Sequence, residues 1–138
     1  MVGTRIATFH RLKDHAGTLR GSKQLIVDNG SPEQRIIGER TLNLMRENHL
    51  TPQQEQDFMW IQFNGYSYGL GVRTLVSRAA AGSAGALGEY GWGGAAGTYF
   101  LADPAEKLTI VYGQQTDPNE EQYVHPRIRN LVYAGLEK

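Results

Sequence analysis

The stretch that decides the fold runs from Gly88 to Pro104 and reads GEYGWGGAAGTYFLADP. Its glycines lack a Cβ atom, so they suit places where a backbone approaches another group closely or where φ is positive. The alternating residues 98–101, followed by Asp103-Pro104, are typical of a strand that ends in a turn. We therefore predict one strand over residues 91–102 and expect it to wall a cleft beside Trp92.

The sequence around this stretch predicts an α+β fold with an antiparallel sheet flanked by helices. Apolar alternation favours strands within residues 66–78 and over 108–112, and the five-residue turn 103–107 favours an antiparallel hairpin. Residues 79–88 are small and predict a loop between strands. Pro126 suits the first turn of a terminal helix. The apolar stripe of that helix consists of Ile128, Leu131, Val132, Gly135 and Leu136.

The N-terminal part of the chain is less regular. Apolar runs predict short strands at residues 6–9 and 24–27, the second ending at the turn signal 28–30. No motif gives this part a role of its own. We therefore leave residues 1–30 unassigned and expect residues 31–138 to form one partial domain.

A helical pattern begins at Glu39 and continues to about Asn48. Leu42 and Met45 share one face of it, and Thr51-Pro52 is predicted to end the segment. The polar residues 53–57 then predict a connector. This helix precedes the sheet in the chain.

The composition is that of a globular domain, with 138 residues, 40% hydrophobic and 20% charged. Fourteen basic and fourteen acidic residues cancel, which gives no electrostatic footprint for nucleic acid or an anionic membrane. No apolar stretch is long enough to span a bilayer, and the first residues lack a signal-peptide core. The chain has no cysteine, which excludes a disulfide framework and a thiol nucleophile. The compartment stays open; it is cytoplasmic if Met1 is the true start.

Signatures of cofactors and metals are absent from the sequence. Residues 91–96 fit a dinucleotide fingerprint poorly, because a strand follows them where the phosphate would need a helix N-terminus. The four histidines have no metal-ligand spacing. We expect His49 near the C-terminus of its helix and His125 at the surface or in a cap. The predicted chain holds neither a cofactor nor a metal.

None of the serines lies in a nucleophile motif. No Gly-x-Ser-x-Gly occurs, no serine has a lysine three residues later, and no tyrosine begins a Tyr-x-Asn triplet. Ser83 lies in a Gly-Ala loop that we expect to be exposed and too mobile for catalysis. The five serines are Ser22, Ser31, Ser67, Ser77 and Ser83.

Several segments together nevertheless resemble a known order. The segments are the helix region 35–50, GYSYGLGV at 65–72, the stretch 88–104, LTIVY at 108–112 and the closing helix. In order and spacing they are similar to the C-terminal third of the β-lactamase-related serine hydrolases, which include class C β-lactamases, D-alanyl-D-alanine peptidases and esterases. The resemblance covers about residues 30–138.

The resemblance implies a fold that pairs an antiparallel sheet with an all-helical subdomain. It also implies a serine nucleophile in a Ser-x-x-Lys motif, assisted by a tyrosine, and a third motif on a strand that walls the cleft. Trp92-Gly93-Gly94 takes the position of that third motif, with Tyr90 beside it in the substrate groove. The backbone N–H of Ala95 then forms one half of an oxyanion hole.

Two departures from the family pattern shape the expected function. Trp92 stands where many relatives carry a cation, and an uncharged indole favours a small neutral ester or acyl substrate over β-lactams and peptide C-termini. The Ser-x-x-Lys and the catalytic tyrosine, which the family has upstream, are absent from these 138 residues. We therefore expect the oxyanion side of an esterase-like cleft that is catalytically incomplete alone.

Three alternatives stay open at this point. The first is a non-catalytic interaction module on the same scaffold, and the second is a β-lactamase or D-alanyl-D-alanine peptidase as the parent activity. The third is small-ligand binding in a groove at Trp92 and Tyr90. Unpaired sheet edges predict that a complementary N-terminal fragment or a second copy covers the chain. Neither nucleic acid nor a membrane is an expected partner.

Overall fold

The computed structural model describes residues 6–11, 37–58, 60 and 63–136. The strand predicted at residues 24–27 and the turn at 28–30 lie outside these ranges. Among the described residues, no helix is both long and apolar enough to cross a membrane.

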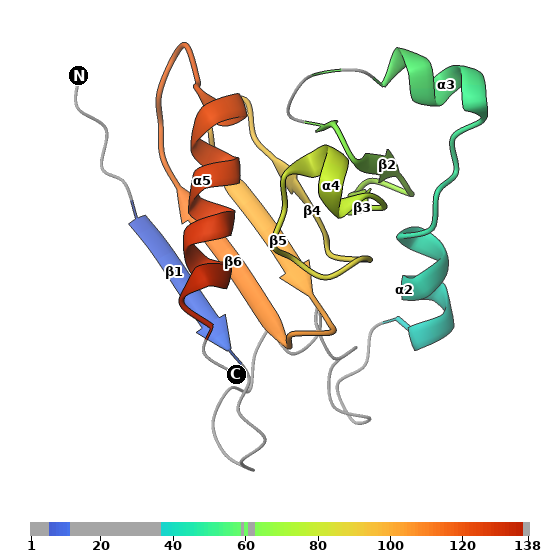
Figure 1. Cartoon of the computed structure of the whole chain (residues 1–138), viewed down its shortest axis with the longest axis horizontal. Helices are drawn as coiled ribbons and strands as arrows, with labels where there is room; N and C mark the ends of the chain where they lie inside the picture. Colours follow the sequence, from blue (N-terminus) through green and yellow to red (C-terminus); the bar gives the residue numbers. More distant parts are fainter. Residues whose placement is uncertain (1–5, 12–36, 59, 61–62, 137–138) are drawn as a thin grey trace.

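The described strands form one antiparallel sheet with the order β1-β6-β5-β4-β3-β2 (Figure 1). The predicted antiparallel sheet is therefore confirmed, and the strand expected at residues 6–9 is confirmed as its edge strand β1. The predicted run 66–78 contains two short strands rather than one. The strands are β1 (Ile6–Arg11), β2 (Tyr66–Tyr68), β3 (Arg73–Leu75), β4 (Tyr90–Gly93), β5 (Tyr99–Asp103) and β6 (Leu108–Gly113).

The prediction of one strand over residues 91–102 is wrong, because the chain folds back on itself within it. In the resulting hairpin of β4 and β5, Trp92 pairs with Phe100. The Gly97 N–H donates to the Gly94 carbonyl over 2.8 Å, and Gly97 has a φ of +87°, which glycine adopts without strain. The glycine-rich stretch is therefore a tight turn between two strands.

The helices are α2 (Glu39–Met45), α3 (Pro52–Asp57), α4 (Arg78–Ala81) and α5 (Glu121–Ala134). The predicted connector at residues 53–57 is wrong, since these residues belong to α3. Thr51 starts that helix instead of ending the preceding one: its side chain accepts the Gln54 N–H while the Gln54 side chain accepts the Thr51 N–H. A short helix, α4, also interrupts the predicted loop 79–88.

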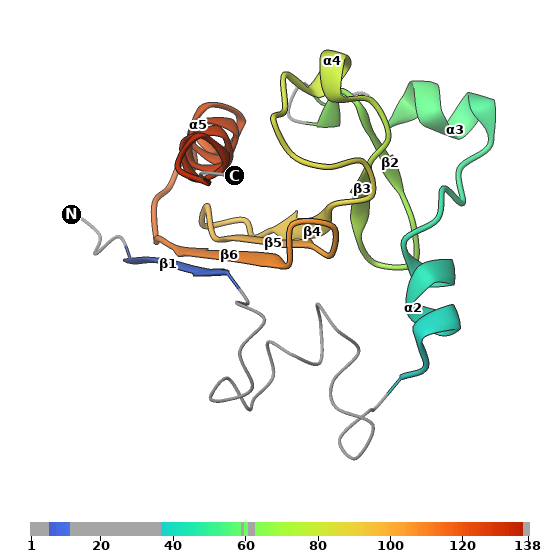
Figure 2. The ribbon, with the colours of Figure 1, turned by 60° about the horizontal axis from the view of Figure 1, so that its bottom comes forward.

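Helix α5 covers one face of the sheet (Figures 1 and 2). It begins at Glu121, so Pro126 lies inside the helix and not in its first turn. The predicted apolar stripe is partly wrong, because Leu131 is 73% exposed. Ile128, Val132 and Leu136 do pack against the core. The fully buried α5 side chains are His125, Arg129 and Tyr133, at successive turns of the helix.

Two apolar clusters hold the sheet. The larger one joins side chains of β5 and β6 to Tyr133 of α5. The smaller one contains Tyr90 and Ala102, with Leu42 of α2 packed against them. Because side chains alternate along a strand, β5 contributes to both clusters, whereas β4 contributes Tyr90 to the smaller one. Strand β5 is therefore packed on both faces.

Candidate functional site

The turn between β4 and β5 presents Ala95 to solvent. No partner for the N–H of Ala95 is recorded among the residues that the structure describes. Trp92 and Gly93 are the last residues of β4, and Gly94 begins the turn that leads to Ala95. The predicted tripeptide thus lies at the end of the strand that precedes this main-chain donor.

An aromatic cluster surrounds Trp92, whose side chain is 38% exposed. The ring centroid of Trp92 lies 5.5 Å from that of Phe63 and 5.3 Å from that of Tyr68. Phe58 stacks on Phe63 at 4.7 Å, and the largely exposed Trp60 lies 6.2 Å from Phe63. These rings flank the strand before the turn, and the buried Arg73 guanidinium lies 5.2 Å from the centre of the Phe63 ring.

Tyr90 takes a different position from Trp92. Its side chain is only 3% exposed and packs in the smaller core cluster. The Arg46 guanidinium lies 5.8 Å from the centre of its ring, and burial raises the pKa of Tyr90 to about 12. Of the two predicted aromatic site residues, the structure therefore places Trp92 at the surface and Tyr90 beneath it.

His125 is the residue for which the sequence prediction was most clearly wrong. It is 2% exposed instead of lying at the surface or in a cap. Its ring stacks on Tyr99 with centroids 4.6 Å apart, and its Nε2 lies 2.9 Å from the Gly97 carbonyl oxygen. Burial lowers the pKa of His125, although its contact with the Gly97 carbonyl acts in the opposite direction. The net shift favours the neutral ring.

A chain of buried hydrogen-bonded side chains connects α5 to residues at the ends of the hairpin strands that lie away from the Ala95 turn. Arg129 donates to the Tyr66 hydroxyl, and Tyr66 donates to Oε1 of Glu89. The Tyr133 hydroxyl lies 2.7 Å from Oε2 of Glu89 and 2.6 Å from Oδ2 of Asp103. Glu89 and Asp103 are both fully buried.

The Tyr133 hydroxyl has one proton and contacts both carboxyl groups, so one carboxyl group must supply a second proton. Asp103 also accepts the backbone N–H groups of Ala86, Ala105 and Glu106. Burial raises the pKa of Glu89, which favours the arrangement in which Glu89 carries that proton. In this arrangement Glu89 is a neutral acid within a donor chain that ends on Asp103.

This arrangement predicts a pH-dependent stability. Burial raises the pKa of Glu89 above its ordinary value of 4.5, so folding takes up a proton and stability falls as pH rises from 4.5 toward the folded pKa. Glu89→Gln should remove this slope, which amounts to about 1.4 kcal/mol per pH unit. Urea unfolding of both proteins at about pH 5, 6 and 7 measures it. Equal slopes for the two proteins would show that Glu89 is ionised in the fold.

The described serines offer no activated nucleophile. Ser67 is buried and its Oγ has no hydrogen-bond partner among the described residues. Ser77 caps α4 by accepting the Ala80 N–H. The expectation that Ser83 is exposed is wrong: it is buried, and its Oγ accepts the Gly85 N–H. Ser22 and Ser31 lie outside the described residues, as do any contacts they make.

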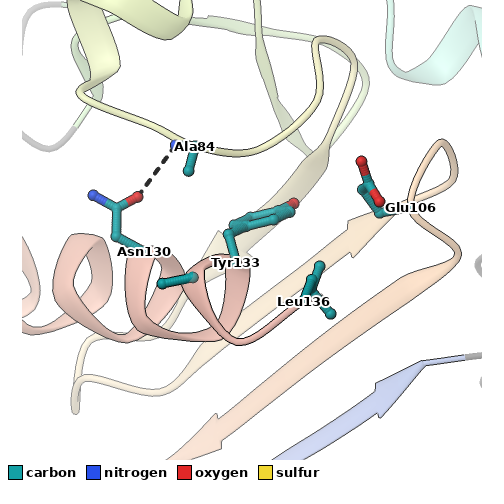
Figure 3. Close-up of a pocket in the computed structure, with 6 residues that line it drawn as sticks. Ala84, Glu106, Asn130, Tyr133 and Leu136 are labelled. Atoms are coloured by element: carbon teal, nitrogen blue, oxygen red, sulfur yellow. Dashed lines mark hydrogen bonds between the residues drawn. The ribbon is translucent and has the colours of Figure 1, made fainter. Parts of the chain in front are cut away.

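The described residues contain no group of three or more His, Asp or Glu side chains arranged to hold a metal ion. A hollow of about 170 Å³ lies beside the C-terminal half of α5 (Figure 3). Glu106 of the turn after β5 lines it, so it lies at the opposite end of that strand from the Ala95 turn. Its six lining residues are Ala84, Glu106, Asn130, Tyr133, Ala134 and Leu136.

Comparison with known proteins gives relatives at low identity. No protein-family profile matches the chain. Protein Rv1367c and the uncharacterized protein MT1414, from two strains of Mycobacterium tuberculosis, are each 30% identical to it over 106 residues. The match covers 73% of this chain and 26% of each relative. The chain therefore spans about a quarter of the length of the curated relatives it matches.

Two solved structures are similar in fold. EstCE1, described as a hydrolase with promiscuous acyltransferase activity, matches with a TM-score of 0.61 and 24% identity, over 80% of this chain and 27% of its own. The simvastatin synthase LovD from Aspergillus terreus matches with a TM-score of 0.65 and 17% identity, over 84% of this chain and 32% of its own. The chain thus adopts the C-terminal portion of the β-lactamase/transpeptidase-like fold.

Proposed function

We propose that this chain supplies one wall of an esterase-like cleft. The Trp92-Gly93-Gly94 strand lines the cleft, and the backbone N–H of Ala95 donates one of the two oxyanion hydrogen bonds. The observation that carries the proposal is the exposed turn, where a main-chain donor without a partner among the described residues follows a strand flanked by aromatic rings. Such a donor stabilises the negative charge that develops in acyl transfer.

The substrate class follows from the charge of the wall. No cation stands at position 92, and the rings of Phe63 and Tyr68 pack against the indole. An apolar flank favours a small neutral ester or acyl group over a substrate carboxylate. EstCE1, similar in fold, is described as a hydrolase with acyltransferase activity, which fits the same chemistry.

The proposed nucleophile comes from sequence outside these residues, carried by a complementary segment. Without a serine and a base, the oxyanion donor alone gives at best a residual rate. The alternative function is a binding module on this scaffold with no chemistry. The large exposure of Trp60 favours that alternative, because an exposed ring beside other rings suits a partner surface.

A chimera tests the proposal. In it, residues 37–136 of this chain replace the matching quarter of EstCE1, which retains its own nucleophile. We expect the chimera to hydrolyse p-nitrophenyl butyrate, because the replaced part needs only to supply the wall. The isolated chain should show no turnover above buffer.

Two outcomes would contradict the proposal. A folded chimera, with a cooperative thermal transition, that hydrolyses no ester would favour the binding module. Turnover by the isolated chain that a serine-directed phosphonate abolishes would reveal a nucleophile within it.

A further inference from the structure

One segment of the chain bonds three consecutive carbonyl groups of the turn between β4 and β5. The Thr116 N–H donates to the Ala96 carbonyl over 3.1 Å, and the Asn119 side-chain amide donates to the Ala95 carbonyl over 2.6 Å. His125 Nε2 lies 2.9 Å from the Gly97 carbonyl oxygen. Three consecutive carbonyl groups are thus bonded by residues 116–125.

These bonds determine the direction of the Ala95 amide. In a planar trans peptide, the carbonyl and the following N–H point in opposite directions. Because Thr116 fixes the direction of the Ala96 carbonyl, the Gly97 N–H in the same peptide unit points the opposite way. It donates to the Gly94 carbonyl over 2.8 Å. The Gly94 carbonyl belongs to the same peptide unit as the Ala95 N–H. The amide of the proposed oxyanion hole is thereby aimed away from the segment that holds the turn.

His125 is the buried member of this set of donors. The carbonyl oxygen of Gly97 only accepts, so a neutral His125 ring carries its proton on Nε2. Its Nδ1 has no hydrogen-bond partner within the described part of the chain. The ring lies between Tyr99, stacked at 4.6 Å, and Tyr112, edge-on at 6.4 Å. Packing therefore fixes the ring plane, and the donor can point only at the turn.

The approach of α5 to the turn explains one glycine of the Trp-Gly-Gly motif. A Cβ atom at Gly93 would lie 3.3 Å from Cε1 of His125 and 3.1 Å from an Oε atom of Glu121. Both distances are shorter than ordinary van der Waals contacts, so a Cβ atom there would require the two side chains to give way by a few tenths of an ångström. Gly93 lets His125 reach Gly97.

We infer that residues 116–125 form a clamp that positions the Ala95 amide, with His125 as its buried positioning residue. The functional meaning of the clamp rests on the proposed function, because the direction of the Ala95 N–H affects catalysis only if an oxyanion binds it. The clamp itself is a property of the chain and is measurable without catalysis.

The test uses the isolated chain, labelled with ¹⁵N. His125→Phe retains a ring that stacks on Tyr99 and loses the donor, whereas the side-chain amide of His125→Gln can donate again. Tyr123→Phe, on the exposed side of α5, is the matched control. Nuclear magnetic resonance gives the His125 tautomer, the relaxation of the Ala95 and Ala96 amides, and the shift of the Ala95 amide on addition of methylphosphonate, a tetrahedral anion.

We expect an Nε2–H tautomer in the wild type and increased motion of both turn amides in His125→Phe. The affinity for methylphosphonate should fall by about three- to tenfold, as for the loss of one hydrogen bond, with rescue in His125→Gln. An Nδ1–H tautomer would overturn the clamp. Turn amides that remain as rigid in a folded His125→Phe as in Tyr123→Phe would also overturn it. A wild type with a rigid turn that binds no methylphosphonate would instead refute the oxyanion role and leave the clamp supported.

Discussion

Asp103→Asn is expected to destabilise the fold by about 2–4 kcal/mol, since it leaves buried donors without an acceptor. The carboxylate of Asp103 accepts three backbone N–H groups and the Tyr133 hydroxyl. An asparagine keeps one acceptor oxygen and turns an NH₂ group toward donors that the other oxygen had satisfied. The free energy of unfolding from urea titration at pH 7 measures this loss.

Glu89→Gln is the matched control for this substitution. Glu89 is equally buried, yet its place in the donor chain is that of a neutral acid. A glutamine there accepts from Tyr66 with its oxygen and donates to Tyr133 with its nitrogen. We expect a change of less than about 1 kcal/mol at pH 5, and a variant more stable than the wild type at pH 7, because glutamine takes up no proton on folding. A large loss in Glu89→Gln with little loss in Asp103→Asn would reverse the assignment of the shared proton.

The contrast between these two carboxyl groups was not predictable from the sequence. Asp103 was recognised as a turn residue because Pro104 follows it, and the turn is confirmed. Its contact with Tyr133 joins residues 30 positions apart. Glu89 meets Tyr66 and Tyr133 over 23 and 44 positions. Local sequence patterns do not encode contacts between residues so far apart. From the sequence alone, the buried polar residues that make these contacts therefore look like surface residues.

Helix α5 shows what the apolar periodicity of the sequence can and cannot predict. The apolar residues Ile128 and Val132 correctly predicted which side of the helix meets the sheet. The centre of that side is polar, however: His125 and Arg129 are buried there with their partners. Polar residues spaced four apart beside an apolar stripe were the available signal. If that spacing is taken as part of the buried face, it predicts that both His125 and Arg129 are buried.

The hairpin of β4 and β5 was missed for a different reason. Its turn consists of glycine and alanine from Gly94 to Gly97, without the Asn, Asp or Pro that usually marks a turn. Because residues 98–101 alternate as in a strand, the predicted strand was continued toward the N-terminus through the turn. The close approaches that the glycines predicted are nevertheless present, since a Cβ atom at Gly91 would lie 2.0 Å from the Phe100 carbonyl oxygen.

Ala95→Pro is expected to lower kcat of the EstCE1 chimera by about 10²–10³-fold, the usual effect of removing one oxyanion donor. Proline has no N–H, so this substitution deletes the proposed donor, which no side-chain change can do. The Ala95 carbonyl, which accepts from Asn119, remains available. KM should change much less than kcat, because the interaction strengthens only as the negative charge develops.

Ala95→Gly is the matched control, because it changes the same position and keeps the main-chain N–H. No partner is recorded among the described residues for the N–H of Ala95, so Ala95→Pro breaks no known backbone bond. We expect Ala95→Gly to retain kcat to within about tenfold, with both variants folded by circular dichroism. If the two variants lower kcat equally, the loss reflects distortion of the turn. If Ala95→Pro has no effect, Ala95 is not the oxyanion donor, and the exposed turn serves another purpose.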